Sequence, residues 1–190
     1  MGKDLVVGPT GLLDLKDWIA PHLTERGVAH DMQTWLTAEC DVTLCCLNVA
    51  SVFEFLRHVV QCEGVADEAA GFRAGETGKS RYGNMPWWEH SIWLPVELRS
   101  GNLQADPTIF VGSCVALLRE LRDLQDRSPL RLGSAPPGYQ EMRADIRQFY
   151  RSTNDLHLTE EDCVRWVWLV LRDGAELAMT QNTALCSEPG

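Results

Sequence analysis

The chain has 190 residues, of which 45% are hydrophobic and 23% charged, so its composition is globular and argues against a disordered or fibrous protein. Its net charge of −10 argues against nucleic-acid binding, which needs clustered positive charge. The longest apolar runs are too short to span a membrane, and the first residues lack the apolar stretch of a signal peptide. We therefore expect one globular domain over residues 1–190, located in the cytoplasm.

Apolar residues in the first third of the chain follow helical spacing. Residues 12–24 form one apolar face, and Gly27 is a plausible end for that helix. Asp31 can cap a short helix that carries Trp35. A longer helix is predicted over residues 44–62, because its apolar positions form a wide stripe. We expect this helix to be central.

A glycine-rich stretch follows. Residues 63–86 contain five glycines and few large apolar side chains, which predicts a long loop. Within it, residues 71–80 look like a phosphate-binding P-loop, but Arg73 occupies the position of the first glycine. The flanking residues predict neither the preceding buried strand nor the following helix that such a site needs. We interpret the stretch as a loop without a nucleotide site.

The second half of the chain is again mostly helical in pattern. Residues 90–98 alternate with a period near two, and Pro95 would confine such a strand to an edge. Helices are predicted from Asp106 to about residue 126 and from 138 to 151. A last long helix begins with a capping pair and runs over residues 163–185. The capping residues are Thr159 and Asp162. The predicted fold is therefore mainly α, a single-domain bundle of five to six helices with at most a short extended segment or edge strand near 87–98.

Three tryptophans, an acid and a histidine lie just after the predicted loop. They are Trp87, Trp88, Glu89, His90 and Trp93. The tryptophans can fill the core, anchor an interface through large rigid contacts, or wall a pocket in which an acid orients a histidine. Adjacent residues of an extended chain point to opposite faces, so Glu89 is poorly placed to orient His90. We take the cluster as the candidate partner interface and predict no catalytic residue.

The seven cysteines predict free thiols, because their number is odd and no export signal precedes them. Cys40, Cys45 and Cys46 lie close together but lack the second pair of ligands that a structural zinc site needs. We predict no metal and no cofactor. A catalytic cysteine–histidine pair stays open, since its members can meet only in three dimensions.

Three arginines recur at four-residue spacing along the predicted helix at 138–151. They are Arg143, Arg147 and Arg151. Such a row forms a solvated face, pairs with internal carboxylates, or docks an acidic ligand. Of these alternatives we favour the solvated face.

In size, acidity and lack of catalytic motifs, the chain resembles the small acidic immunity proteins with which bacteria neutralise toxins. That resemblance implies a protein-binding inhibitor or adaptor without catalysis, whose partner is a toxin with a basic surface. The alternative is a small enzyme or ligand-binding protein with a pocket around Glu89 and His90, covered by the loop at 63–86. A closed pocket with converging polar groups would favour the alternative.

Overall fold

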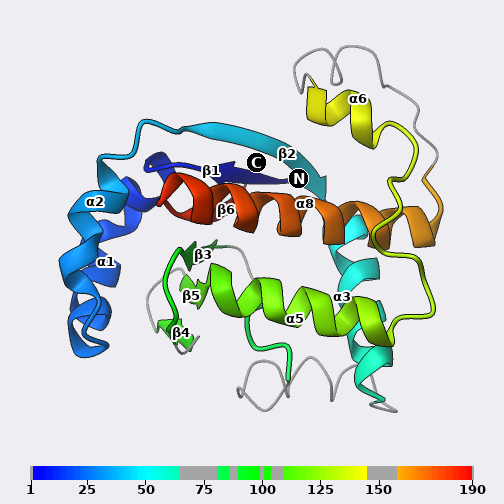
Figure 1. Cartoon of the computed structure of the whole chain (residues 1–190), viewed down its shortest axis with the longest axis horizontal. Helices are drawn as coiled ribbons and strands as arrows, with labels where there is room; N and C mark the ends of the chain where they lie inside the picture. The colour runs from blue at the N-terminus through cyan, green and yellow to red at the C-terminus, as the bar shows by residue number, and fades with distance from the viewer. Residues whose placement is uncertain are drawn as a thin grey trace.

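A six-stranded mixed β-sheet lies at the centre of the computed structural model of the chain (Figure 1). The structure describes residues 2–64, 81–85, 90–98, 101–103, 109–144 and 158–189. The strands are β1 (Gly2–Val7), β2 (Val42–Asn48), β3 (His90–Leu94), β4 (Gly101–Leu103), β5 (Ile109–Ser113) and β6 (Leu185–Pro189). The helices are α1 (Thr10–Glu25), the 3₁₀ turn η1 (Ala29–Asp31), α2 (Met32–Leu36), α3 (Val49–Glu63), α5 (Cys114–Arg127), α6 (Tyr139–Ala144) and α8 (Glu160–Gln181). The chain is an α/β protein, so the prediction of a mainly α bundle is wrong.

The strands lie in the order β2-β1-β6-β3-β5-β4. β3 and β5 are parallel, and every other neighbouring pair is antiparallel. The strand predicted near 87–98 exists as β3, but it lies between β6 and β5 and is not an edge strand. Pro95 follows the last residue of β3, so it removes no hydrogen bond from the ladder.

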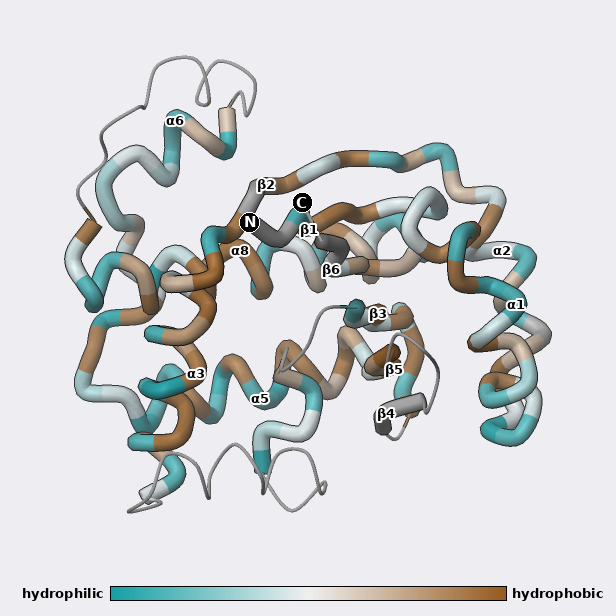
Figure 2. The backbone as a smooth tube through the Cα atoms, turned by 180° about the vertical axis from the view of Figure 1, so that it is seen from behind, coloured by the Kyte–Doolittle hydropathy of each residue, from teal (hydrophilic) through white to brown (hydrophobic). Residues whose placement is uncertain are grey.

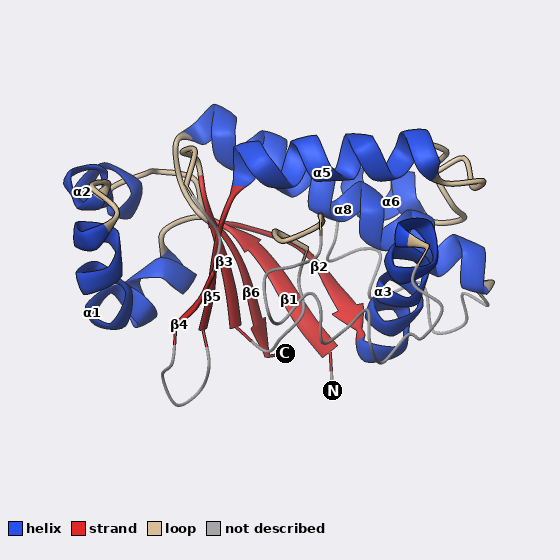
Figure 3. Cartoon of the chain, turned by 90° about the horizontal axis from the view of Figure 1, so that it is seen from below, coloured by secondary structure: helices blue, strands red, loops and turns tan. Residues whose placement is uncertain are grey.

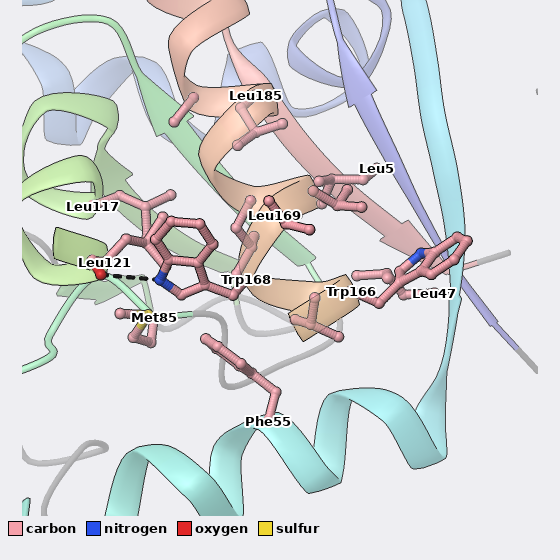
Figure 4. Packing of buried hydrophobic residues seen from close by; sticks show 14 of the residues in the cluster. Leu5, Leu47, Phe55, Met85, Leu117, Leu121, Trp166, Trp168, Leu169 and Leu185 are labelled. Carbon is pink, nitrogen blue, oxygen red and sulfur yellow. Dashed lines mark hydrogen bonds between the residues drawn. The ribbon is translucent and has the colours of Figure 1, made fainter. Parts of the chain in front are cut away.

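Helices α3, α5 and α8 cover one face of the sheet (Figure 3). Trp168 of α8 is buried between this face and α5, and its indole N–H donates to the carbonyl oxygen of Leu121 at 2.9 Å (Figure 4). Phe55 of α3 and Leu5 of β1 belong to the same core. This core is the larger of the two and holds the sheet and the three helices together through buried apolar surface.

Helices α1 and α2 cover the opposite face, over β3, β5 and β6. Ile19 and Trp35 are buried there against Ile92 and Val111. The prediction of an amphipathic helix over residues 12–24 is confirmed by α1. Among the described residues, no helix combines the length and hydropathy needed to cross a membrane.

The predicted helix over residues 44–62 is a strand followed by a helix. β2 ends at Asn48, whose side-chain oxygen accepts the backbone N–H of Ser51 at 2.7 Å and so caps α3. The helical spacing of residues 49–60 continues by chance into β2, where Cys45 and Leu47 are buried as alternate residues of a strand. In the sequence, the capping residue Asn48 is the signal that separates strand β2 from helix α3.

The helix predicted from Asp106 to residue 126 is also shorter than expected. α5 begins after Ser113, whose hydroxyl oxygen accepts the N–H of Ala116 at 3.1 Å. The preceding residues form β5, and all five are buried, so their apolar run resembles a buried helix in sequence. Residues 104–108 lie outside the described part of the chain.

The last two helices are confirmed in part. Thr159 and Asp162 form the predicted capping box of α8. That helix ends at Gln181, because Asn182 adopts a left-handed conformation with φ 49°, and Leu185 belongs to β6. The helix predicted over 138–151 is present as α6 up to Ala144, and residues 145–157 are not among those described.

Candidate functional site

Two residues of the predicted tryptophan cluster fall within the described part of the chain. His90 is half-buried at the start of β3, and Trp93 is completely buried. The indole N–H of Trp93 donates to the backbone oxygen of Asn84 at 2.7 Å. Trp93 therefore takes the core position that the sequence left open and cannot touch a partner in this conformation. Trp87, Trp88 and Glu89 lie outside the described residues.

Asn84 joins the end of the glycine-rich stretch to the core beneath it. Its backbone and side-chain N–H groups each donate to the Glu120 carboxylate at 2.8 Å. Its side-chain oxygen accepts the N–H of Ser113 at 2.9 Å. Burial is the main cause that raises the pKa of Glu120 to about 7, and the bonds from Asn84 oppose it. This polar cluster is fully bonded through Asn84, which is typical of a structural anchor. Residues 65–80, with the P-loop-like segment, are not described.

A cysteine and a histidine do meet, on one face of α3. The Sγ of Cys62 lies 3.5 Å from His58 Nε2, which is 2.8 Å from the hydroxyl oxygen of Ser128. Cys62 and His58 line a cavity of about 500 Å³. Sequence reasoning named the possibility of such a pair without identifying its members.

The chemistry of this cluster does not fit a nucleophile. Burial raises the pKa of the Cys62 thiol, although the positive charge of Arg127 opposes the shift, so the thiol stays protonated at neutral pH. Burial also lowers the pKa of His58. The Ser128 hydroxyl accepts the backbone N–H of Leu130 at 3.0 Å. The cluster thus ties the end of α5 to α3 rather than activating a thiolate.

A larger cavity, of about 530 Å³, opens between β2 and α6. Ten described residues line it: Val42, Thr43 and Leu44 of β2; Tyr139, Met142, Arg143 and Ala144 of α6; and Val170, Asp173 and Leu177 of α8. We call it the β2–α6 groove. Eight of these ten side chains carry no charge, and most are apolar, as in many ligand and peptide sites. Volume and lining make this groove our candidate site.

One wall of the groove is an edge strand. Within the described chain, β2 pairs only with β1, so its outer side has no strand beside it. β2 is hydrophobic over much of its length and runs along the outside of the sheet (Figure 2). Its seven residues include no charge and no proline, the devices with which proteins commonly protect an edge from pairing. Val42 is 42% exposed, which is high for an apolar side chain.

The polar end of the groove centres on Asp173. Its Oδ2 accepts the hydroxyl of Tyr139 at 2.9 Å and lies 3.3 Å from Nη1 of Arg143. Its Oδ1 accepts two N–H groups of Arg172. Burial and the neighbouring Asp173 charge raise the pKa of Tyr139, so the phenol stays protonated and donates. Arg172 also lies over the Trp168 ring, 5.1 Å from its centroid.

Sequence reasoning identified one residue of this site in advance. Arg143 belongs to the predicted row of arginines, and it pairs with an internal carboxylate, one of the three alternatives. The β2 wall was missed because it was assigned to a helix, and Asp173 because a single acid in a long helix carries no signal. Arg147 and Arg151 are outside the described residues.

In the described ranges, no three histidine, cysteine or acidic side chains are placed to hold a metal ion. No protein-family model, no curated protein and no solved structure matches the chain.

Proposed function

We propose that this chain is a protein-binding inhibitor or adaptor that takes up an extended segment of its partner along the outer side of β2. The observation that carries the proposal is the uncharged β2 edge beside an apolar groove of about 530 Å³. Backbone hydrogen bonds to an edge strand supply affinity, and pockets for alternate side chains supply specificity. The outer edge of β2 would supply the backbone hydrogen bonds, and the β2–α6 groove would supply the side-chain pockets.

The partner that fits this proposal best is a bacterial toxin, which the chain would neutralise as an immunity-type protein in the cytoplasm. The support is the net charge of −10, since a surface of one sign accelerates association with a basic protein. The raised pKa of Cys62 also favours a binding function, because a protonated thiol is a poor nucleophile. His90, the described residue of the enzyme alternative, lines neither of the two cavities.

A peptide library tests strand capture directly. Ten-residue peptides displayed on phage are selected on the immobilised protein, and the tightest peptide is synthesised. N-methylation is then placed at each backbone nitrogen in turn. Pairing with β2 predicts that methylation at alternate residues weakens binding at least tenfold, because only alternate N–H groups point at the neighbouring strand. Uniform tolerance to methylation, or a library without binders, would overturn the proposal.

A matched pair of variants locates the peptide. Val42→Ser removes an exposed apolar side chain of the groove, and Val49→Ser removes one of similar exposure, 39%, that does not line it. We expect Val42→Ser to weaken the peptide about three- to tenfold and Val49→Ser to leave it unchanged. Equal losses would place the peptide elsewhere. Co-expression with the product of an adjacent gene then tests whether the partner is a toxin whose effect on growth is relieved.

A further inference from the structure

We propose that the partner segment carries an acidic side chain, aspartate or glutamate, which binds Arg143 at the polar end of the β2–α6 groove. This inference rests on the proposed function, and it names the chemistry of the segment that β2 captures. It follows from the balance of charge and hydrogen bonds among four side chains. They are Tyr139, Arg143, Arg172 and Asp173.

Asp173 already has its partners. Arg172 contacts its Oδ1 through two N–H groups, and Tyr139 donates to its Oδ2 at 2.9 Å. The Asp173 side chain is only 11% exposed, so its oxygens offer little room for a further cation. A basic residue of the partner would therefore find no free acceptor on Asp173.

Arg143 is far more exposed than Asp173. Its side chain is 60% exposed, and its Nη1 lies 3.3 Å from Oδ2 of Asp173. A guanidinium has five N–H donors in a planar fork that matches a carboxylate. Among the described side chains around Asp173, two arginines pair with this one carboxylate, which leaves one positive charge in excess. An incoming carboxylate would neutralise it.

The rest of the groove restricts where that carboxylate can sit. Residues two apart on a strand share a face, so a segment paired with β2 presents alternate side chains to the groove. Val42, Leu44 and Leu177 favour apolar side chains there. Arg143 favours an acid at the position nearest α6. The segment that fits is extended, apolar at alternate positions, and acidic at one of them.

The test compares three proteins and two peptides. The peptide selected from the library is synthesised with its acidic residue and again with the amide in that place (Glu→Gln or Asp→Asn). Affinities are measured for the wild type, Arg143→Gln and Arg122→Gln, where Arg122 is an exposed residue of α5 that does not line the groove. We expect the wild type and Arg122→Gln to prefer the acidic peptide about three- to tenfold.

The preference should disappear in Arg143→Gln, whose affinity for the amide peptide should match that of the wild type within about twofold. Raising the salt concentration should shrink the preference in the wild type. Selected peptides without an acid at a fixed position, or a preference that survives Arg143→Gln, would overturn the inference and leave strand capture intact. A library that yields no binder would instead refute the proposed function.

Discussion

At the scale of single residues, the bond to Asn84 satisfies the indole N–H of the buried Trp93. Trp93→Phe keeps most of the ring volume and removes the N–H that donates to the Asn84 oxygen at 2.7 Å. An unpaired buried carbonyl and a small cavity should lower the free energy of unfolding by about 2–4 kcal/mol, measured by urea denaturation. Trp18→Phe is the control, because Trp18 is 56% exposed and should lose less than about 0.5 kcal/mol. Equal losses in the two variants would contradict the structure.

Glu120 predicts a pH dependence of stability. Its pKa is raised from 4.5 to about 7 by burial, so the folded protein holds a proton that the unfolded chain has released over this range. The proton therefore favours the folded state at low pH, and this contribution is lost as the pH rises through 7. Relative to Glu120→Gln, the wild type should lose on the order of 1–3 kcal/mol of unfolding free energy between pH 5 and pH 8.

The comparison with Glu120→Gln isolates this carboxyl group, because the other titrating groups are common to both proteins. Denaturation curves at several pH values supply the measurement. Parallel pH profiles for the two proteins would show that Glu120 titrates normally. The Asn84–Glu120 bonds would then lower the pKa of Glu120 by as much as burial raises it.

At the scale of elements, Gly174 lets β2 approach α8. A Cβ at this position would lie 2.8 Å from Leu44 Cδ1 and 2.9 Å from Leu185 Cδ1. Alanine normally stabilises a helix interior by roughly 1 kcal/mol relative to glycine, but overpacking costs about 1–3 kcal/mol. Because Leu185 is fully buried and cannot move aside, we expect Gly174→Ala to lower the unfolding free energy by about 1 kcal/mol.

Gly133→Ala is the matched control. Its Cβ would meet only the end of the Gln125 side chain, at 3.3 Å, and Gln125 is exposed and free to shift. This substitution should change stability by less than about 0.5 kcal/mol. A stabilising effect of Gly174→Ala would contradict the close approach of α8 to the β2 wall of the groove.

The elements differ in how well the sequence predicts them. α1 and the capped start of α8 were predictable because both signals are local, a periodic apolar face and the Thr159–Asp162 pair. β5 was not, because a strand buried on both faces has no alternation to distinguish it from a helix. β2 was missed because the apolar residues on both sides of the Asn48 cap happen to follow helical spacing.

At the scale of the whole molecule, the sheet and the site both depend on contacts between residues that are distant in sequence. β1 and β6 pair from opposite ends of the chain, and no local pattern specifies such a contact. The groove likewise joins β2, α6 and α8, which are distant in sequence. Arg143 was predictable as a candidate, whereas its partner Asp173 and the wall at Val42 required the fold.

Backbone amide hydrogen exchange with the selected peptide bound tests the central claim, capture of an extended segment by β2, most directly. Pairing places new hydrogen bonds on the outer side of residues 42–48, so the exchange of alternate amides there should slow at least tenfold. The other edge strand, β4, is the internal reference and should not change. Binding that protects amides elsewhere and leaves residues 42–48 unaltered would contradict the claim.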